Sequence, residues 1–125
     1  MHMNVSLGAH LIFVSDVQAS KTFYRDILGL KLVEENPHFT EYTLPGGRLY
    51  VEEKNPDRAK GFEGVHIGGP TGVVFAVDDI HAVIDEFRRA NVTVLVEPVR
   101  QVWGGWNAII TDADGNQFIL DEDEF

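Results

Sequence analysis

The sequence has five histidines and 20 acidic residues, the side-chain types that most often bind metals or perform acid–base chemistry. The histidines His10 and His66, with a carboxylate such as Glu53 or Asp121, could hold a divalent cation, because imidazole and carboxylate are common metal ligands. In a simpler interpretation, His10 is a structural histidine at a strand end and His66 belongs to a loop. The sequence has no cysteine, no Ser/His/Asp arrangement and no phosphate-binding glycine loop. We therefore predict no particular catalytic residue.

A second group of residues is suited to binding an aromatic molecule. Trp103 and Trp106 flank Gly104 and Gly105, and an indole on such a loop could stack on a flat ligand. A cationic ligand would gain about 0.5–2 kcal/mol from the stacking. Alternatively, one or both tryptophans are packing residues. The formal net charge of −10 favours cationic ligands and disfavours nucleic acid, although it could equally serve only solubility.

The elements that must position these side chains occur twice in the sequence. Ala9–Glu34 aligns with Gly72–Glu97 at an offset of 63 residues, and Thr43–Glu53 aligns with Thr111–Asp121 at an offset of 68. Such self-similarity indicates a duplicated structural unit. We therefore expect the same elements in the same order in both halves of the chain.

The residue pattern of each half predicts the element order β-α-β-β-β. In the first half, Asp16 follows a short apolar strand and is a typical helix N-cap, and Gly29 is a typical residue just beyond a helix end. Asp78 or Asp79 begins the second helix, which runs to Ala90. The other predicted elements are strands at Leu11–Val14, Lys31–Glu35, Phe39–Leu44, Arg48–Glu53, Val73–Val77, Val92–Val96, Trp106–Thr111 and Asn116–Leu120.

These elements define the expected fold class. We predict an α+β protein of two tandem βαβββ modules, with curved mixed sheets that form a partly open barrel or cleft. One domain is expected over residues 1–125, with halves at about 5–54 and 71–122 and a linker over about 55–70. This length can bury a sizeable core. No apolar stretch approaches the roughly 18–20 residues that span a membrane, and no secretion signal is evident, so a cytoplasmic location is expected.

Three short segments form a motif pattern that is more specific than the element order alone. They are Val14–Val17 with Phe23–Gly29, Val77–Ile80, and Asp112–Asn116. In this order and spacing they resemble the vicinal-oxygen-chelate superfamily, which includes glyoxalases, bleomycin-resistance proteins and extradiol dioxygenases. In the last segment, Ala113 stands where the family commonly has proline. With the repeat, the resemblance covers about residues 7–122 and implies the paired βαβββ fold.

The resemblance also implies where a metal would bind. Enzymes of the superfamily hold a divalent metal with His, Glu or Gln on inward-facing strand positions, and the metal acts as a Lewis acid. In this sequence those positions fall at Ala9, Gly72, Val51 and Ile119, none of which can bind a metal. We therefore expect no metal and no cofactor. His10 lies one residue from such a position, where strand alternation points it to the helix side unless a β-bulge intervenes.

The same positions predict the lining of the cleft. If Val51 and Ile119 face inward, alternation places Tyr50 and Phe118 on the helix side as core residues. The lining is then apolar and aromatic, with acidic residues at its rim, unless these acids are only solvated strand-end charges. The predicted ligand-binding residues are Phe39, Glu41, Val51, Glu53, Trp103, Trp106, Asn107, Ile119 and Asp121.

The functional expectation follows from this lining. The sequence is similar to metal-free, antibiotic-sequestering members of the superfamily, which implies a homodimer that binds a small aromatic cation. The alternative is a metal-dependent lyase, isomerase, dioxygenase or thiol transferase that uses His10 and displaced ligands. A third possibility is a metal-free member with a structural or regulatory binding role. No nucleic acid or membrane partner is expected.

Overall fold

The computed structural model describes residues 3–54, 61, 62 and 64–123. The chain divides into two compact units, Met1–Glu53 and Lys54–Phe125, and each unit has its own sheet and its own helix. Of the predicted linker, residues 55–60 and 63 lie outside the described residues. The helices in the described part of the chain are all too short or too polar to cross a bilayer.

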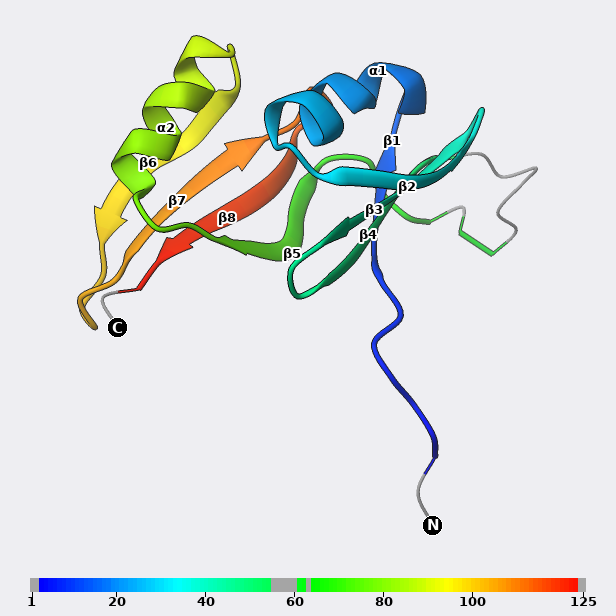
Figure 1. Ribbon diagram of the computed structural model, residues 1–125, viewed down its shortest axis with the longest axis horizontal. Helices are drawn as coiled ribbons and strands as arrows, with labels where there is room; N and C mark the ends of the chain where they lie inside the picture. Colours follow the sequence, from blue (N-terminus) through cyan, green and yellow to red (C-terminus); the bar gives the residue numbers. More distant parts are fainter. Residues whose placement is uncertain (1–2, 55–60, 63, 124–125) are drawn as a thin grey trace. The chain divides into compact units, whose positions relative to one another are not determined.

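The first unit is a four-stranded sheet with a helical segment between its first two strands (Figure 1). Its sheet has the order β1-β4-β3-β2, in which β1 is parallel to β4 and the other neighbours are antiparallel. Along the chain the elements are β1 (His10–Val14), α1 (Val17–Lys21), the π-helix η1 (Thr22–Ile27), β2 (Lys31–Asn36), β3 (Phe39–Leu44) and β4 (Gly47–Glu53).

The second unit repeats this plan. Its sheet has the order β5-β8-β7-β6, again with one parallel pair, β5 and β8. Its elements are β5 (Gly69–Ala76), α2 (Ile80–Arg89), β6 (Thr93–Arg100), β7 (Trp106–Thr111) and β8 (Asn116–Glu122). The predicted α+β class and the order β-α-β-β-β in both halves are confirmed, and neither described sheet closes into a barrel.

Both helices begin at the predicted aspartates. The Asp16 carboxylate accepts hydrogen bonds from the backbone N–H groups of Gln18 and Ala19, and the Asp79 carboxylate accepts one from Ala82. These bonds satisfy N–H groups that have no partner inside the helix. After the first helical segment, Gly29 has φ 72°, a left-handed conformation that glycine adopts at low cost.

The first helix differs from the predicted regular α-helix. After Lys21 it widens into the π-helix η1, and the N–H of Leu28 bonds to the carbonyl of Phe23 at 2.8 Å. Phe23 and Tyr24 are adjacent in sequence, yet both are buried, and their rings meet edge to face with centroids 4.8 Å apart. The wider turn accompanies the burial of two consecutive aromatic rings.

Each unit has its own hydrophobic core between its sheet and its helix. In the sheets, buried and less buried positions alternate, because successive strand residues point to opposite faces. The core of the first unit includes Ile12, Val14, Val17, Tyr24, Tyr42, Leu49 and Val51. The core of the second includes Ile80, Ile84, Phe87, Ala108, Ile110, Phe118 and Leu120.

The two hairpins differ in length by one residue. In the first unit Thr43 pairs with Arg48, whereas in the second unit the equivalent Thr111 pairs with Gln117. The offset between the halves is therefore 68 residues up to the turn and 69 after it, because 117 − 48 = 69. The extra residue belongs to a turn built around Asp112, whose carboxylate accepts the N–H groups of Asp114 and Asn116.

Candidate functional site

The face of the second sheet that points away from α2 contains three of the predicted site residues. Ala108, Phe118 and Leu120 are buried on the α2 side, so by alternation Asn107, Ile119 and Asp121 lie on the opposite face. Directly paired residues share a face, which extends this set. We call it the open face: Val74, Val96, Val99, Asn107, Ile109, Ile119 and Asp121.

The open face is mainly aliphatic and partly exposed. Val74, Val99 and Val96 keep 54%, 47% and 38% of their surface accessible within the described chain. Large exposed aliphatic side chains that gather on one sheet face are typical of a binding surface. This surface could therefore accept an apolar group.

A single carboxylate lies among these aliphatic residues, and a neighbouring amide orients it. The Asn107 Nδ2 donates to Asp121 Oδ1 at 2.7 Å and also reaches the carbonyl oxygen of Leu120 at 3.3 Å. Because Asn107 and Asp121 are directly paired across β7 and β8, the sheet itself fixes their separation. The arrangement presents a negative charge in a fixed direction, which suits a cationic or hydrogen-bond-donating ligand group.

The corresponding face of the first sheet has a different character. Phe39 and Glu41 lie on it, as predicted by alternation, but their neighbour on β4 is Tyr50. The Phe39 and Tyr50 rings meet with centroids 5.3 Å apart, and Glu41 lies 3.8 Å from an Arg48 guanidinium nitrogen. This face therefore combines aromatic rings with a neutralised carboxylate.

The predicted orientation of Val51 is wrong. Val51 is 0% exposed and pairs with Thr40, which is also fully buried and donates its hydroxyl to the Val51 carbonyl at 2.9 Å. Both residues lie on the helix side. The prediction used one offset of 68 across the whole hairpin, whereas the longer second turn makes Tyr50, not Val51, the equivalent of Ile119.

The same one-residue error applies to Glu53. Its carboxylate accepts the backbone N–H of Val17 at the start of α1, at 3.2 Å, and lies 2.7 Å from His38 Nδ1. Hydrogen bonds from His38 and from the Val17 N–H lower the pKa of Glu53 below its usual value. Glu53 therefore stabilises the helix start, and in the second unit Glu122 does the same for the N–H of Ile80 at 2.8 Å.

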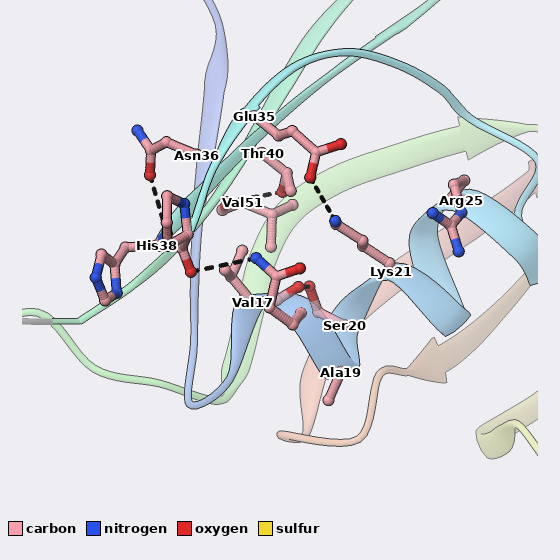
Figure 2. A network of polar contacts seen from close by, with 12 residues as sticks. Val17, Ala19, Ser20, Lys21, Arg25, Glu35, Asn36, His38, Thr40 and Val51 are labelled. Atoms are coloured by element: carbon pink, nitrogen blue, oxygen red, sulfur yellow. Dashed lines mark hydrogen bonds and ion pairs between the residues drawn. The ribbon is translucent and has the colours of Figure 1, made fainter.

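Polar contacts join the elements on the helix side of the first unit. Figure 2 shows the Asn36 side chain at the backbone of His38, the ion pair of Lys21 with Glu35, and the bond from Thr40 to Val51. The ion pair joins the helix to β2, the Asn36 bond closes the turn between β2 and β3, and the Thr40 bond joins β3 to β4. They belong to the framework of the unit and not to its open side.

The two tryptophans of the predicted aromatic site lie in different environments. The Trp106 ring packs edge-on against the His81 ring of α2, with centroids 4.7 Å apart, so it lies on the helix side of its sheet. Trp103 is 57% exposed. A Cβ on Gly105 would lie 2.8 Å from the Trp103 Nε1, which means that the indole rests directly on this glycine.

The residues considered for a metal site are divided between the two units, with His10 and Glu53 in the first and His66 and Asp121 in the second. His66 is exposed in the loop before β5, and His10 is the first residue of β1, on the parity of the buried Ile12 and Val14. Across the described residues, no group of three or more His, Asp or Glu side chains is arranged to hold a metal ion. With the corrected register, the implied ligand positions are Ala9, Tyr50, Gly72 and Ile119.

Comparisons with known proteins agree with the observed fold. A solved structure described as a member of the glyoxalase/bleomycin resistance protein/dioxygenase superfamily, from Sphaerobacter thermophilus DSM 20745, is 28% identical, covers 95% of this chain and 98% of its own, and superposes with a TM-score of 0.77.

Two further solved structures have known activities in their descriptions. TnmS3, an antibiotic binding protein from Streptomyces sp. CB03234, is 24% identical with a TM-score of 0.76, over 98% of this chain and 100% of its own. The lactoylglutathione lyase of Agrobacterium tumefaciens is 20% identical with a TM-score of 0.75, over 94% and 92%. The family model "Glyoxalase/Bleomycin resistance protein/Dioxygenase superfamily" matches residues 6–120, and the chain therefore belongs to this superfamily.

Proposed function

We propose that this protein binds a small apolar or aromatic molecule with a cationic group, without the help of a metal ion. The observation that carries the proposal is the open face, where exposed valines surround a carboxylate held by Asn107. Aliphatic side chains would cover the apolar part of the ligand, and Asp121 would accept its charged or hydrogen-bonding group.

One further feature supports a cationic ligand. The chain carries a net charge of −10, which attracts cations over a distance, and salt weakens this attraction.

Similar folds serve both antibiotic binding in TnmS3 and catalysis in lactoylglutathione lyase, so the fold alone does not decide between binding and catalysis. The choice rests on Ala9, Gly72, Tyr50 and Ile119, which occupy the implied ligand positions in place of His, Glu and Gln.

The test compares an aromatic cation with an uncharged molecule of the same shape. We expect isothermal titration calorimetry to show binding of the cation, with an affinity that falls as salt rises. Asp121→Asn should lower the affinity for the cation about tenfold or more, which corresponds to about 1.4 kcal/mol. The affinity for the uncharged analogue should change by less than about threefold. The substitution preserves the shape of the side chain.

A matched control separates this local effect from the overall charge. Glu86→Gln removes one negative charge from an exposed position on α2, away from the open face, and should leave the affinity nearly unchanged. Equal losses in both variants would mean that only the net charge matters. Binding that appears only after a divalent metal is added would overturn the proposal in favour of the metal-dependent alternative.

A further inference from the structure

The pair of Asn107 and Asp121 offers a ligand hydrogen-bond acceptors and no donor. The Asn107 Nδ2 carries two hydrogens, and its bonds to Asp121 Oδ1 at 2.7 Å and to the Leu120 carbonyl oxygen at 3.3 Å account for both. The reverse orientation of the amide would bring its oxygen against the carboxylate, which repels it. The atoms that remain for a ligand are the Asn107 carbonyl oxygen and Asp121 Oδ2, and an ionised carboxylate, like a carbonyl, only accepts.

The surroundings of the pair supply no donor either. The other residues of the open face are all Val or Ile. β7 and β8 are the two inner strands of their sheet, so their backbone N–H groups lie in the plane of the sheet and are directed at neighbouring strands. Among the described residues, Asp121 takes part in none of the ion pairs, whereas Glu41 of the first unit lies 3.8 Å from an Arg48 nitrogen.

Two acceptors side by side distinguish between cations of equal charge. A quaternary ammonium ion has the charge that Asp121 attracts but no N–H group, so it would displace water from both acceptors without replacing the lost hydrogen bonds. A primary ammonium group has three N–H groups and can bond to both, because Asn107 and Asp121 are directly paired across the strands. Selection between the two kinds of cation therefore depends on hydrogen bonding and not on charge.

We propose that the open face selects cations with at least two N–H groups, such as primary amines, over quaternary ammonium ions of the same shape. Asn107 determines this specificity, because its carbonyl oxygen takes a second N–H group after Asp121 has taken the first. The inference rests on the proposed function and adds to it the class of cation that the site binds.

The main experiment uses four naphthalene derivatives that differ only in the methylation of one ammonium group. The series runs from 2-naphthylmethylammonium through its N-methyl and N,N-dimethyl forms to the N,N,N-trimethyl form, so the number of N–H groups falls at constant charge. By isothermal titration calorimetry, we expect the N-methyl form to bind wild-type protein at least about fivefold more tightly than the N,N-dimethyl form. A loss at the first methyl group as large as that at the second would refute the proposal, because it would reflect size.

Two variants test the role of Asn107. Asn107→Leu removes the carbonyl oxygen, so that one N–H group for Asp121 is enough, and the N-methyl and N,N-dimethyl forms should then bind within about twofold of each other. Ile119→Ala is the control: it removes apolar surface from the same face and should weaken both forms equally, which leaves their affinity ratio unchanged. If Asn107→Leu also retains the wild-type ratio, Asn107 has only a structural role and the inference is wrong.

The uncharged analogue 2-naphthylmethanol separates this inference from the proposed function. If no ammonium form binds more tightly than the alcohol, the open face does not bind cations and the proposed function fails as well. If all four forms bind equally, and more tightly than the alcohol, the proposed function stands and the selection for N–H groups is refuted.

Discussion

The two units are most alike where their sheets meet their helices, and they differ most on the opposite faces. Glu53 in the first unit and Glu122 in the second each extend from the end of the last strand and accept the first N–H of the helix, from Val17 and Ile80. Each of these bonds reinforces an aspartate cap. The repeated carboxylates therefore belong to the architecture that the duplication preserved.

The opposite faces have diverged. In the first unit the Phe39 ring meets the Tyr50 ring edge to face and Glu41 is near Arg48, whereas in the second unit the open face combines valines and isoleucines with the carboxylate of Asp121. The helix sides maintain the fold and tolerate little change. Under the proposed function, ligand specificity would depend on the faces away from the helices.

The largest effect should come from adjacent residues on the two faces of β8. Leu120 is 1% exposed on the α2 side, so Leu120→Ala should cost about 2–5 kcal/mol of unfolding free energy. Ile119→Ala removes a half-buried side chain from the open face and should cost about 1 kcal/mol or less of unfolding free energy. It should also weaken ligand binding. Urea unfolding measures both costs, and a greater loss from Ile119 would reverse the assignment of the two faces.

An intermediate effect is expected at the capping carboxylates. Glu53→Gln should cost about 0.5–1 kcal/mol at pH 7, because the helix start loses a charged acceptor. The lowered pKa of Glu53 means that its contribution is complete above its ordinary value of 4.5 and is lost as the pH falls through its folded value. The difference between wild type and variant should therefore stay constant from pH 7 to about pH 4.5 and shrink as the pH falls further.

His38 provides the control for this prediction. Its Nδ1 lies 2.7 Å from Glu53, and Figure 2 shows the histidine at the turn beside Asn36. His38→Ala in the Glu53→Gln background should cost less than His38→Ala alone, since the partner carboxylate has already been lost. Additive costs in a double-mutant cycle would mean that the pair contributes no coupling.

The smallest effect is expected at Tyr42. Its side chain is fully buried, burial raises its pKa more than the nearby Thr40 hydroxyl lowers it, and its own hydroxyl makes no hydrogen bond of ordinary geometry among the described residues. At the equivalent position the second unit has Ile110, which is entirely apolar. Tyr42→Phe should therefore be neutral or stabilise the chain by up to about 1 kcal/mol in thermal unfolding. A loss above about 1 kcal/mol would reveal a partner for the hydroxyl.

Much of the fold could be predicted from the sequence because the repeat tests each element twice. Asp16 and Asp79 mark both helix starts, and their helix and strand patterns agree between the halves. Strand positions depend on local alternation and turn residues, which can be recognised in a single sequence. The superfamily followed from the order and spacing of the same segments.

The candidate site was harder to predict because side-chain direction depends on register. One additional residue in the Asp112 turn reverses the faces of Val51 and Glu53 relative to a gap-free alignment, and no local pattern reveals it. The packing of Trp106 on His81 depends on the position of α2, and the helix-capping role of Glu53 requires a contact 36 residues away. Such relationships appear only once the chain is folded.

The capping glutamates also have a consequence for folding kinetics. The hydrogen bond at each helix start joins residues 36 positions apart in the first unit and 42 in the second. A helix start cannot be completed until the last strand of its unit has reached it, so the whole unit must assemble before this contact contributes. Contacts of such sequence separation slow folding, and they couple the helix to the hairpin in one cooperative transition.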